Sequence, residues 1–173
     1  MKAKYLLFTI VFIIALSLDQ ATKVWARQAL KPRGYDRAVV VIPGYFDLRY
    51  SENTGSAFGM FRGTPGARYF LFAIGIICLG IIGAWLYKIP HSAAWLAAKL
   101  GLLAGGAVGN IVDRALYGRV SDFIVWKVTT GGRVYEWPTF NIADAALVVG
   151  VALLLIDWPR DAVFKQQAQQ AGA

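Results

Sequence analysis

The chain has 173 residues, of which 57% are hydrophobic and 16% are charged, whereas a soluble domain carries about 25% charged residues. The mean hydropathy is +0.50 and the formal net charge is +8. These values exclude a disordered chain and a typical soluble globular protein. Because the basic residues lie between apolar blocks, we expect membrane phospholipid as a partner and no nucleic acid.

Four apolar blocks predict four helices that cross a membrane, since each approaches the roughly 20 residues that span a bilayer. The sequence therefore predicts an all-α membrane protein with one domain over residues 1–173, a four-transmembrane-helix bundle. The blocks lie at about residues 5–25, 69–87, 93–112 and 142–158, with outer loops at 26–68 and 113–141 and a frayed tail at 165–173.

The first block also fits a different kind of segment. Basic residues from Met1 to Lys4, followed by a short apolar run that ends at Ala15-Leu16-Ser17, are typical of a secretory signal peptide. The local sequence does not decide between a retained helix and a cleaved signal.

Both long connections carry strand patterns. Ala38–Ile42 is rich in β-branched residues, and Tyr45–Tyr50 alternates apolar with polar side chains. In the second connection, Phe123–Val128 and Arg133–Trp137 flank a Gly131-Gly132 turn signal. Four spans would place both connections on one side of the membrane, with the termini and residues 88–92 on the other. The plain Lys and Arg count of the positive-inside rule would instead put the long connections inside.

A single Cys and a single His exclude several chemistries. Cys78 cannot form an intrachain disulfide, and zinc sites built from Cys and His sets are excluded. A Ser-His-Asp hydrolase would depend on His91, which follows Pro90 in a short link between two apolar blocks. We expect no metal and no cofactor.

Charged and polar residues at membrane depth are costly and indicate function. Asp19 and Lys23 are spaced i,i+4 and predict a local ion pair, and Asp113 is expected to pair with Arg114. Glycines at positions 101, 105 and 109 form a small-residue stripe whose next member is Asp113, so this acid should point into the bundle. Alternating topology places three polar groups at one membrane face: Asp19 and Lys23; Asn110, Asp113 and Arg114; and Asn141 and Asp144.

Asp122 and Asp144 have no cation placed near them in the local sequence. Two carboxylates that meet in a partly dry site share one proton, which supplies a base and an acid together. Such a pair suits water-driven amide hydrolysis or a proton or ion pathway, and these residues alone do not separate an enzyme from a small transporter. A structural membrane subunit, in which the acids only pair with Lys23 and Arg114, is a third possibility.

Five motifs in this order resemble bacterial lipoprotein signal peptidase, or signal peptidase II. The motifs are Asp19-Gln-Ala-Thr-Lys23, Asn53-Thr-Gly-Ser-Ala-Phe58, Gly105-Gly-Ala-Val-Gly-Asn110-Ile-Val-Asp113-Arg114, Val120-Ser-Asp122-Phe123 and Phe140-Asn141-Ile-Ala-Asp144. They cover most of the chain, and the one small departure is Ser56, where the family often has Ala.

The resemblance implies an intramembrane aspartic endopeptidase that removes the signal peptide from diacylglyceryl-modified prolipoproteins, cleaving N-terminal to the lipidated Cys. It implies a monomer in the bacterial cytoplasmic (inner) membrane, with a retained first helix and both termini cytoplasmic. The site would lie near the outer face under a small extracytoplasmic β-cradle with a short helix. Peptide inhibitors of the globomycin type are an implied partner.

Residue by residue, the resemblance makes Asp122 and Asp144 the catalytic pair. The residues expected to order the substrate are Asn53, Gly55, Asn110, Arg114 and Asn141, and those expected to support the site are Asp19, Lys23 and Asp113. Gly55 either lets backbone approach the substrate or only makes a turn. Asn141 either orients Asp144 or only caps the fourth helix.

Overall fold

The computed structural model describes residues 3–55 and 66–171. Four long helices and a small sheet make up this part of the chain. In order, the elements are α1 (Ala3–Ala29), the 3₁₀ helix η1 (Lys31–Arg33), β1 (Val39–Ile42), β2 (Phe46–Asn53), α2 (Ala67–Lys88), α3 (Ala94–Tyr117), β3 (Val120–Thr130), β4 (Arg133–Glu136) and α4 (Ile142–Ala171). The motif residues 56–58 lie outside the described residues.

The architecture is mostly helical, with a small antiparallel sheet, as the sequence predicts. Among the described residues, three helical segments are long and apolar enough to cross a membrane: Ala3–Arg33, Tyr69–Lys88 and Ala94–Tyr117. Helix α4 is not among them, so the fourth span stays a prediction.

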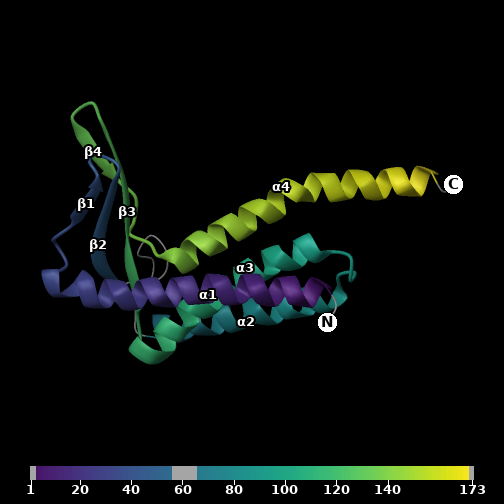
Figure 1. Cartoon of the computed structure of the whole chain (residues 1–173), viewed down its shortest axis with the longest axis horizontal. Coiled ribbons are helices and arrows are strands. Elements are labelled where there is room, and N and C mark those ends of the chain that lie inside the picture. The colour runs from purple at the N-terminus through teal and green to yellow at the C-terminus, as the bar shows by residue number, and fades with distance from the viewer. Residues whose placement is uncertain (1–2, 56–65, 172–173) are drawn as a thin grey trace.

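The sheet stands at one end of the helices, while the beginning of α1 and the end of α4 lie away from it (Figure 1). Its strands follow the order β1-β2-β3-β4, and each is antiparallel to its neighbour. Gly131 and Gly132 have φ values of +56° and +73° and close the hairpin between β3 and β4. Only residues that tolerate positive φ at both positions make this tight turn, so the predicted turn signal is confirmed.

Close packing of α3 on α1 brings the polar ends of these helices together. A Cβ atom on Gly105 would lie 2.7 Å from the Cβ of Ala15, and one on Gly109 would collide with the Asp19 carboxylate. The glycine stripe therefore faces α1. Its next member, Asp113, is completely buried, which confirms the predicted direction of that side chain.

The helices are longer than the apolar blocks. Helix α3 continues past residue 112 to Tyr117 and ends where Gly118, at φ +70°, donates its N–H to the Arg114 carbonyl. Helix α1 likewise extends to Ala29, because polar residues beyond its apolar run find buried partners on α3. Helical backbone also covers residues 165–171, which the sequence assigns to a frayed tail.

At the end of the helices away from the sheet, a buried cation joins the start of α1 to the end of α2. The ammonium of Lys4, only 1% exposed, donates to the carbonyls of Leu86 at 2.9 Å and Ile89 at 2.7 Å. These carbonyls close the C-terminal end of α2, where unpaired backbone oxygens favour a cation. The start of α1 is therefore fixed beside the link at residues 88–92. A second ion pair, between the buried Lys99 of α3 and Asp157, joins α3 to α4.

Candidate active site

Asp122 of β3 and Asp144 in the first turn of α4 are joined by one amide side chain. Asn141 donates its Nδ2 to Asp122 Oδ1 at 2.6 Å. Its Oδ1 accepts the Asp144 N–H at 3.0 Å, while its own N–H donates to Asp144 Oδ2 at 3.3 Å. This reciprocal pair is a capping box. Asn141 thus does both things that the sequence left open, since it caps α4 and holds both carboxylates.

Two further amides hold the outer oxygens of the pair. Asn53 of β2 donates to Asp122 Oδ2 at 3.2 Å, and Asn110 of α3 donates to Asp144 Oδ1 at 2.8 Å. Asp122 is only 2% exposed. Burial, reinforced by the nearby Asp144 charge, raises the pKa of Asp122 to about 7. Near neutral pH this carboxyl can therefore both hold and release a proton.

Below the pair lies a buried ion pair between Asp19 and Lys23, as the i,i+4 spacing predicts. The two charged atoms are 2.9 Å apart and both side chains are fully buried. Lys23 also donates to Asn110 Oδ1 at 2.9 Å, and Asp19 accepts the N–H of Ala143 at 2.9 Å. The pair therefore ties α1 to the residue that binds Asp144 and to the start of α4.

Asp113 pairs with a different cation from the one predicted. Its Oδ1 lies 3.3 Å from Arg27 Nη1 and its Oδ2 lies 3.7 Å from Lys23 Nζ. Oδ2 also accepts the N–H of Ser121 at 2.9 Å. The predicted pairing of Asp113 with Arg114 is wrong, because neighbouring residues on a helix do not face each other.

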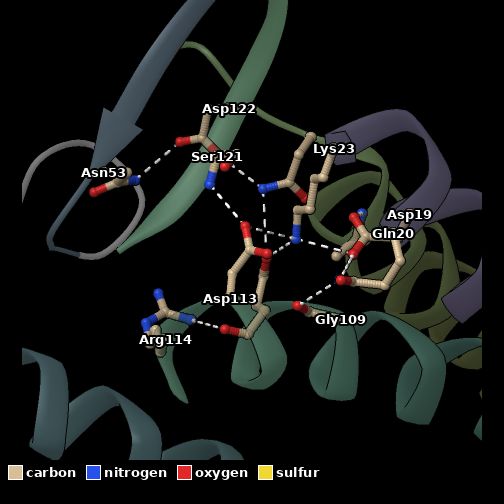
Figure 2. Close-up of polar contacts among 12 residues, drawn as sticks. Asp19, Gln20, Lys23, Asn53, Gly109, Asp113, Arg114, Ser121 and Asp122 are labelled. Atoms are coloured by element: carbon tan, nitrogen blue, oxygen red, sulfur yellow. Dashed lines mark hydrogen bonds and ion pairs between the residues drawn. The ribbon is translucent and has the colours of Figure 1, made fainter. Parts of the chain in front are cut away.

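Arg114 turns instead toward the loop after β2. Its Nη2 donates to the carbonyl of Gly55 at 3.4 Å, and its Nη1 donates to the carbonyl of Asn110 at 3.3 Å. The N–H of Gly55 donates to Asn53 Oδ1 at 2.9 Å, so Gly55 closes a side-chain turn and receives an arginine contact. Figure 2 shows Asn53 of β2, Asp122 of β3, Lys23 of α1 and Asp113 of α3 pointing toward one another.

All ten residues that the sequence proposes for the site lie in this one network of contacts. Sequence reasoning missed Arg27, Ser121 and Gln20, whose Nε2 donates to Asp19 Oδ2 at 2.9 Å and to the carbonyl of Gly109 at 3.1 Å. The spacing of four from Lys23 to Arg27 continues the polar face of α1 and could have identified the arginine. Within the described residues, no group of three or more His, Cys, Asp or Glu side chains is placed to hold a metal ion.

Comparison with known proteins gives matches over most of the chain. The family model described as signal peptidase (SPase) II matches residues 11–159. A lipoprotein signal peptidase of Geobacter metallireducens is 36% identical over 93% of this chain and 95% of its own length. One from Rhodopseudomonas palustris is 39% identical over 84% of this chain and 87% of its own length.

A solved structure described as a bacterial membrane enzyme superimposes with a TM-score of 0.76 at 30% identity, covering 90% of this chain and 88% of that one. A second structure with the same description gives 0.75 at 29% identity. The family match covers the sheet, the paired carboxylates, two of the three candidate membrane segments in full and the first of them from residue 11. The chain belongs to the signal peptidase II family of peptidases.

Proposed function

We propose that this chain is an intramembrane aspartic endopeptidase that removes the signal peptide from diacylglyceryl-modified prolipoproteins, cleaving N-terminal to the lipidated Cys. The matching family and the relatives named lipoprotein signal peptidase support the reaction. The observation that carries the mechanism is the pair of carboxylates held by Asn141. The transporter interpretation of the same acids has no support among the relatives.

The proposed mechanism divides one proton between two carboxylates. Asp144 takes a proton from water, whose oxygen bonds to the scissile carbonyl carbon, while Asp122 donates its proton to the carbonyl oxygen. The raised pKa of Asp122 supports its role as the acid. Asp144 lies at a helix N-terminus, where a negative charge is stabilised. The intermediate then collapses as the amide C–N bond breaks: Asp144 gives its proton to the leaving nitrogen, and Asp122 takes a proton back from a hydroxyl of the intermediate as the C=O bond forms again.

The remaining site residues have two proposed roles. Those that order the substrate backbone are Asn53, Gly55, Asn110, Arg114 and Asn141, and those that support the catalytic pair are Asp19, Lys23 and Asp113. The contacts of the first group with the two carboxylates and with the loop at Gly55 support this division.

We place the protein in the bacterial cytoplasmic membrane as a monomer with four spans, α4 being the fourth. Both termini and the link at residues 88–92 are cytoplasmic, and the sheet and the active site lie at the outer face. The sheet lies at the opposite end of the helices from the contact between Lys4 and the end of α2 (Figure 1). This supports the proposal that the sheet is on one side of the membrane and that the link at residues 88–92 is on the other. Phospholipid surrounds the helices, and globomycin-like peptides are proposed to compete with substrate.

Cysteine labelling in whole cells tests this topology. On a Cys78→Ala background, a cysteine at exposed Thr129 should react with an impermeant maleimide from outside, because it lies in the β3–β4 hairpin. A cysteine at exposed Ser92 should react only after the membrane is opened. The reverse pattern would put the sheet in the cytoplasm and overturn the proposed orientation.

Substrate lipidation should control turnover. Each buried CH₂ of an acyl chain contributes about 0.8 kcal/mol, so burying even five of them changes kcat/KM by about a thousandfold. We expect at least this loss when the purified protein is given the same precursor without its diacylglyceryl group. A precursor with one acyl chain, measured in the same detergent, should fall between the two. Equal rates for all three precursors would contradict the proposed substrate class.

A further inference from the structure

Arg27 lies one turn beyond Lys23 on α1 and joins two groups next to the catalytic strand. Its Nη1 donates to Ser121 Oγ at 2.9 Å and lies 3.3 Å from Asp113 Oδ1. The guanidinium also lies 4.5 Å from the centroid of the Tyr117 ring, whose face attracts a cation. With its side chain only 17% exposed, Arg27 is held between α3 and β3.

The charge of Arg27 balances the buried acids beneath the catalytic pair. Asp19 and Asp113 are both fully buried, and Lys23 and Arg27 are the cations paired with them. Lys23 Nζ is 2.9 Å from both Asp19 and Asn110 but 3.7 Å from Asp113. Because Arg27 neutralises Asp113, Lys23 stays on Asp19 and on the amide that binds Asp144.

Ser121 transmits this arrangement to Asp122, the next residue. Its N–H is held by Asp113, its hydroxyl accepts from Arg27, and the same hydroxyl lies 3.3 Å from Tyr50 OH. Ser121, the residue before Asp122, is therefore held by its backbone N–H and by its hydroxyl. Because the residue before it is held, the Asp122 carboxylate keeps its orientation.

We infer that Arg27 is a positioning residue of this peptidase: through Ser121 and Asp113 it fixes the backbone before Asp122, and its charge completes the neutral cluster below the catalytic pair. The inference rests on the proposed catalytic role of Asp122 and Asp144. It adds a residue that none of the five motifs contains.

Charge balance makes a prediction that packing alone does not. Among the described residues, the titratable and charged groups around Asp122 are Asp144 of α4; Asp19, Lys23 and Arg27 of α1; Asp113 and Arg114 of α3; and Tyr50 and Glu52 of β2. If the Arg27 charge is removed and the others stay, the cluster gains one net negative charge. A carboxyl near added negative charge holds its proton to higher pH.

The experiment is the pH profile of kcat/KM on a lipidated precursor. Arg27→Gln should shift the profile to higher pH by about one unit. Arg27→Lys, which keeps the charge, should hold the wild-type profile. Adding Asp113→Asn to Arg27→Gln removes one acid with one cation and should bring the profile back toward wild type.

Two variants separate position from charge. Ser121→Ala removes only the hydroxyl, so it should lower kcat by about tenfold while the profile stays in place. Arg33→Gln removes an exposed cation of η1 whose Nε donates to the carbonyl of Ala29. It should change neither kcat nor the profile, and it serves as the matched charge control.

An unshifted profile in Arg27→Gln would overturn the inference. If Arg27→Gln does not fold, Asp113→Asn gives the opposite test, because it leaves Arg27 uncompensated and should move the profile to lower pH; no movement there also overturns it. Failure of the proposed function is a distinct result, namely that Asp122→Asn or Asp144→Asn retains turnover.

Discussion

Asp122→Asn and Asp144→Asn should each lower kcat by at least about a thousandfold, because general acid–base catalysis contributes on that order and each change removes the shared proton. The double variant should be little slower than either single one, since residues that act as a unit are not additive. Cleavage of a lipidated precursor measures both. Asp47→Asn is the matched control: it removes a buried acid of β2 that pairs with Lys127 outside the site, and it should retain turnover.

Asp122→Asn should also make the protein more stable at high pH. The pKa of Asp122 is about 7 in the folded state and about 3.9 unfolded. Between these values the folded state binds more protons, so wild-type stability falls as pH rises from about 4 to about 7. Asn carries no such cost, and Asp122→Asn should gain about 2–4 kcal/mol at pH 8 and little at pH 4.

Thermal unfolding in detergent at both pH values measures this gain. Loss of activity together with a lower melting temperature at pH 8 would mean that Asp122 stabilises the fold. Substantial remaining activity in either single variant would remove that residue from the catalytic pair.

Among the proposed single substitutions, Lys23→Met should cause the largest loss of stability. Met keeps much of the length of the side chain but leaves the fully buried Asp19 without its cation, and removing one partner of a buried ion pair costs about 3–5 kcal/mol. Activity should fall as well, because Asn110 loses the donor that orients it toward Asp144.

Lys31→Met is the comparison for this change. Lys31 pairs with Glu52 at 2.8 Å, but its side chain is 43% exposed, and exposed pairs contribute about 0–1 kcal/mol. Melting temperatures of the two variants should therefore differ widely. Equal melting temperatures would show that the buried pair adds no more than a surface pair does.

Contacts that are close in sequence could be predicted from the residues alone. The Asp19–Lys23 pair follows from helical spacing, and the β3–β4 hairpin follows from Gly131-Gly132 between two strand patterns. The gathering of polar groups at one end of the helices followed from counting spans. Each of these steps needs only the period of an element and the alternation of its direction.

The period and direction of single elements do not predict contacts between distant segments. Arg27 and Asp113 are 86 residues apart, and no pattern in either segment indicates a contact with the other. Adjacency in the sequence predicts a pair between Asp113 and Arg114, yet side chains adjacent on a helix point about 100° apart. Hydropathy also predicts helix ends that are too early, because it falls where polar residues begin, whereas the helical backbone continues wherever those residues find partners.

The contacts of Asp19 have a consequence for the order in which the protein is made. As α1 enters the membrane, Asp19 and Lys23 can neutralise each other at once, but the amide of Asn110 lies 87 residues beyond Lys23 and the N–H of Ala143 lies 124 residues beyond Asp19. The polar cluster therefore closes only when the start of α4 has been synthesised and has docked. Until then the nascent chain holds a paired charge and no assembled polar cluster, so we expect peptidase activity only after α4 has docked.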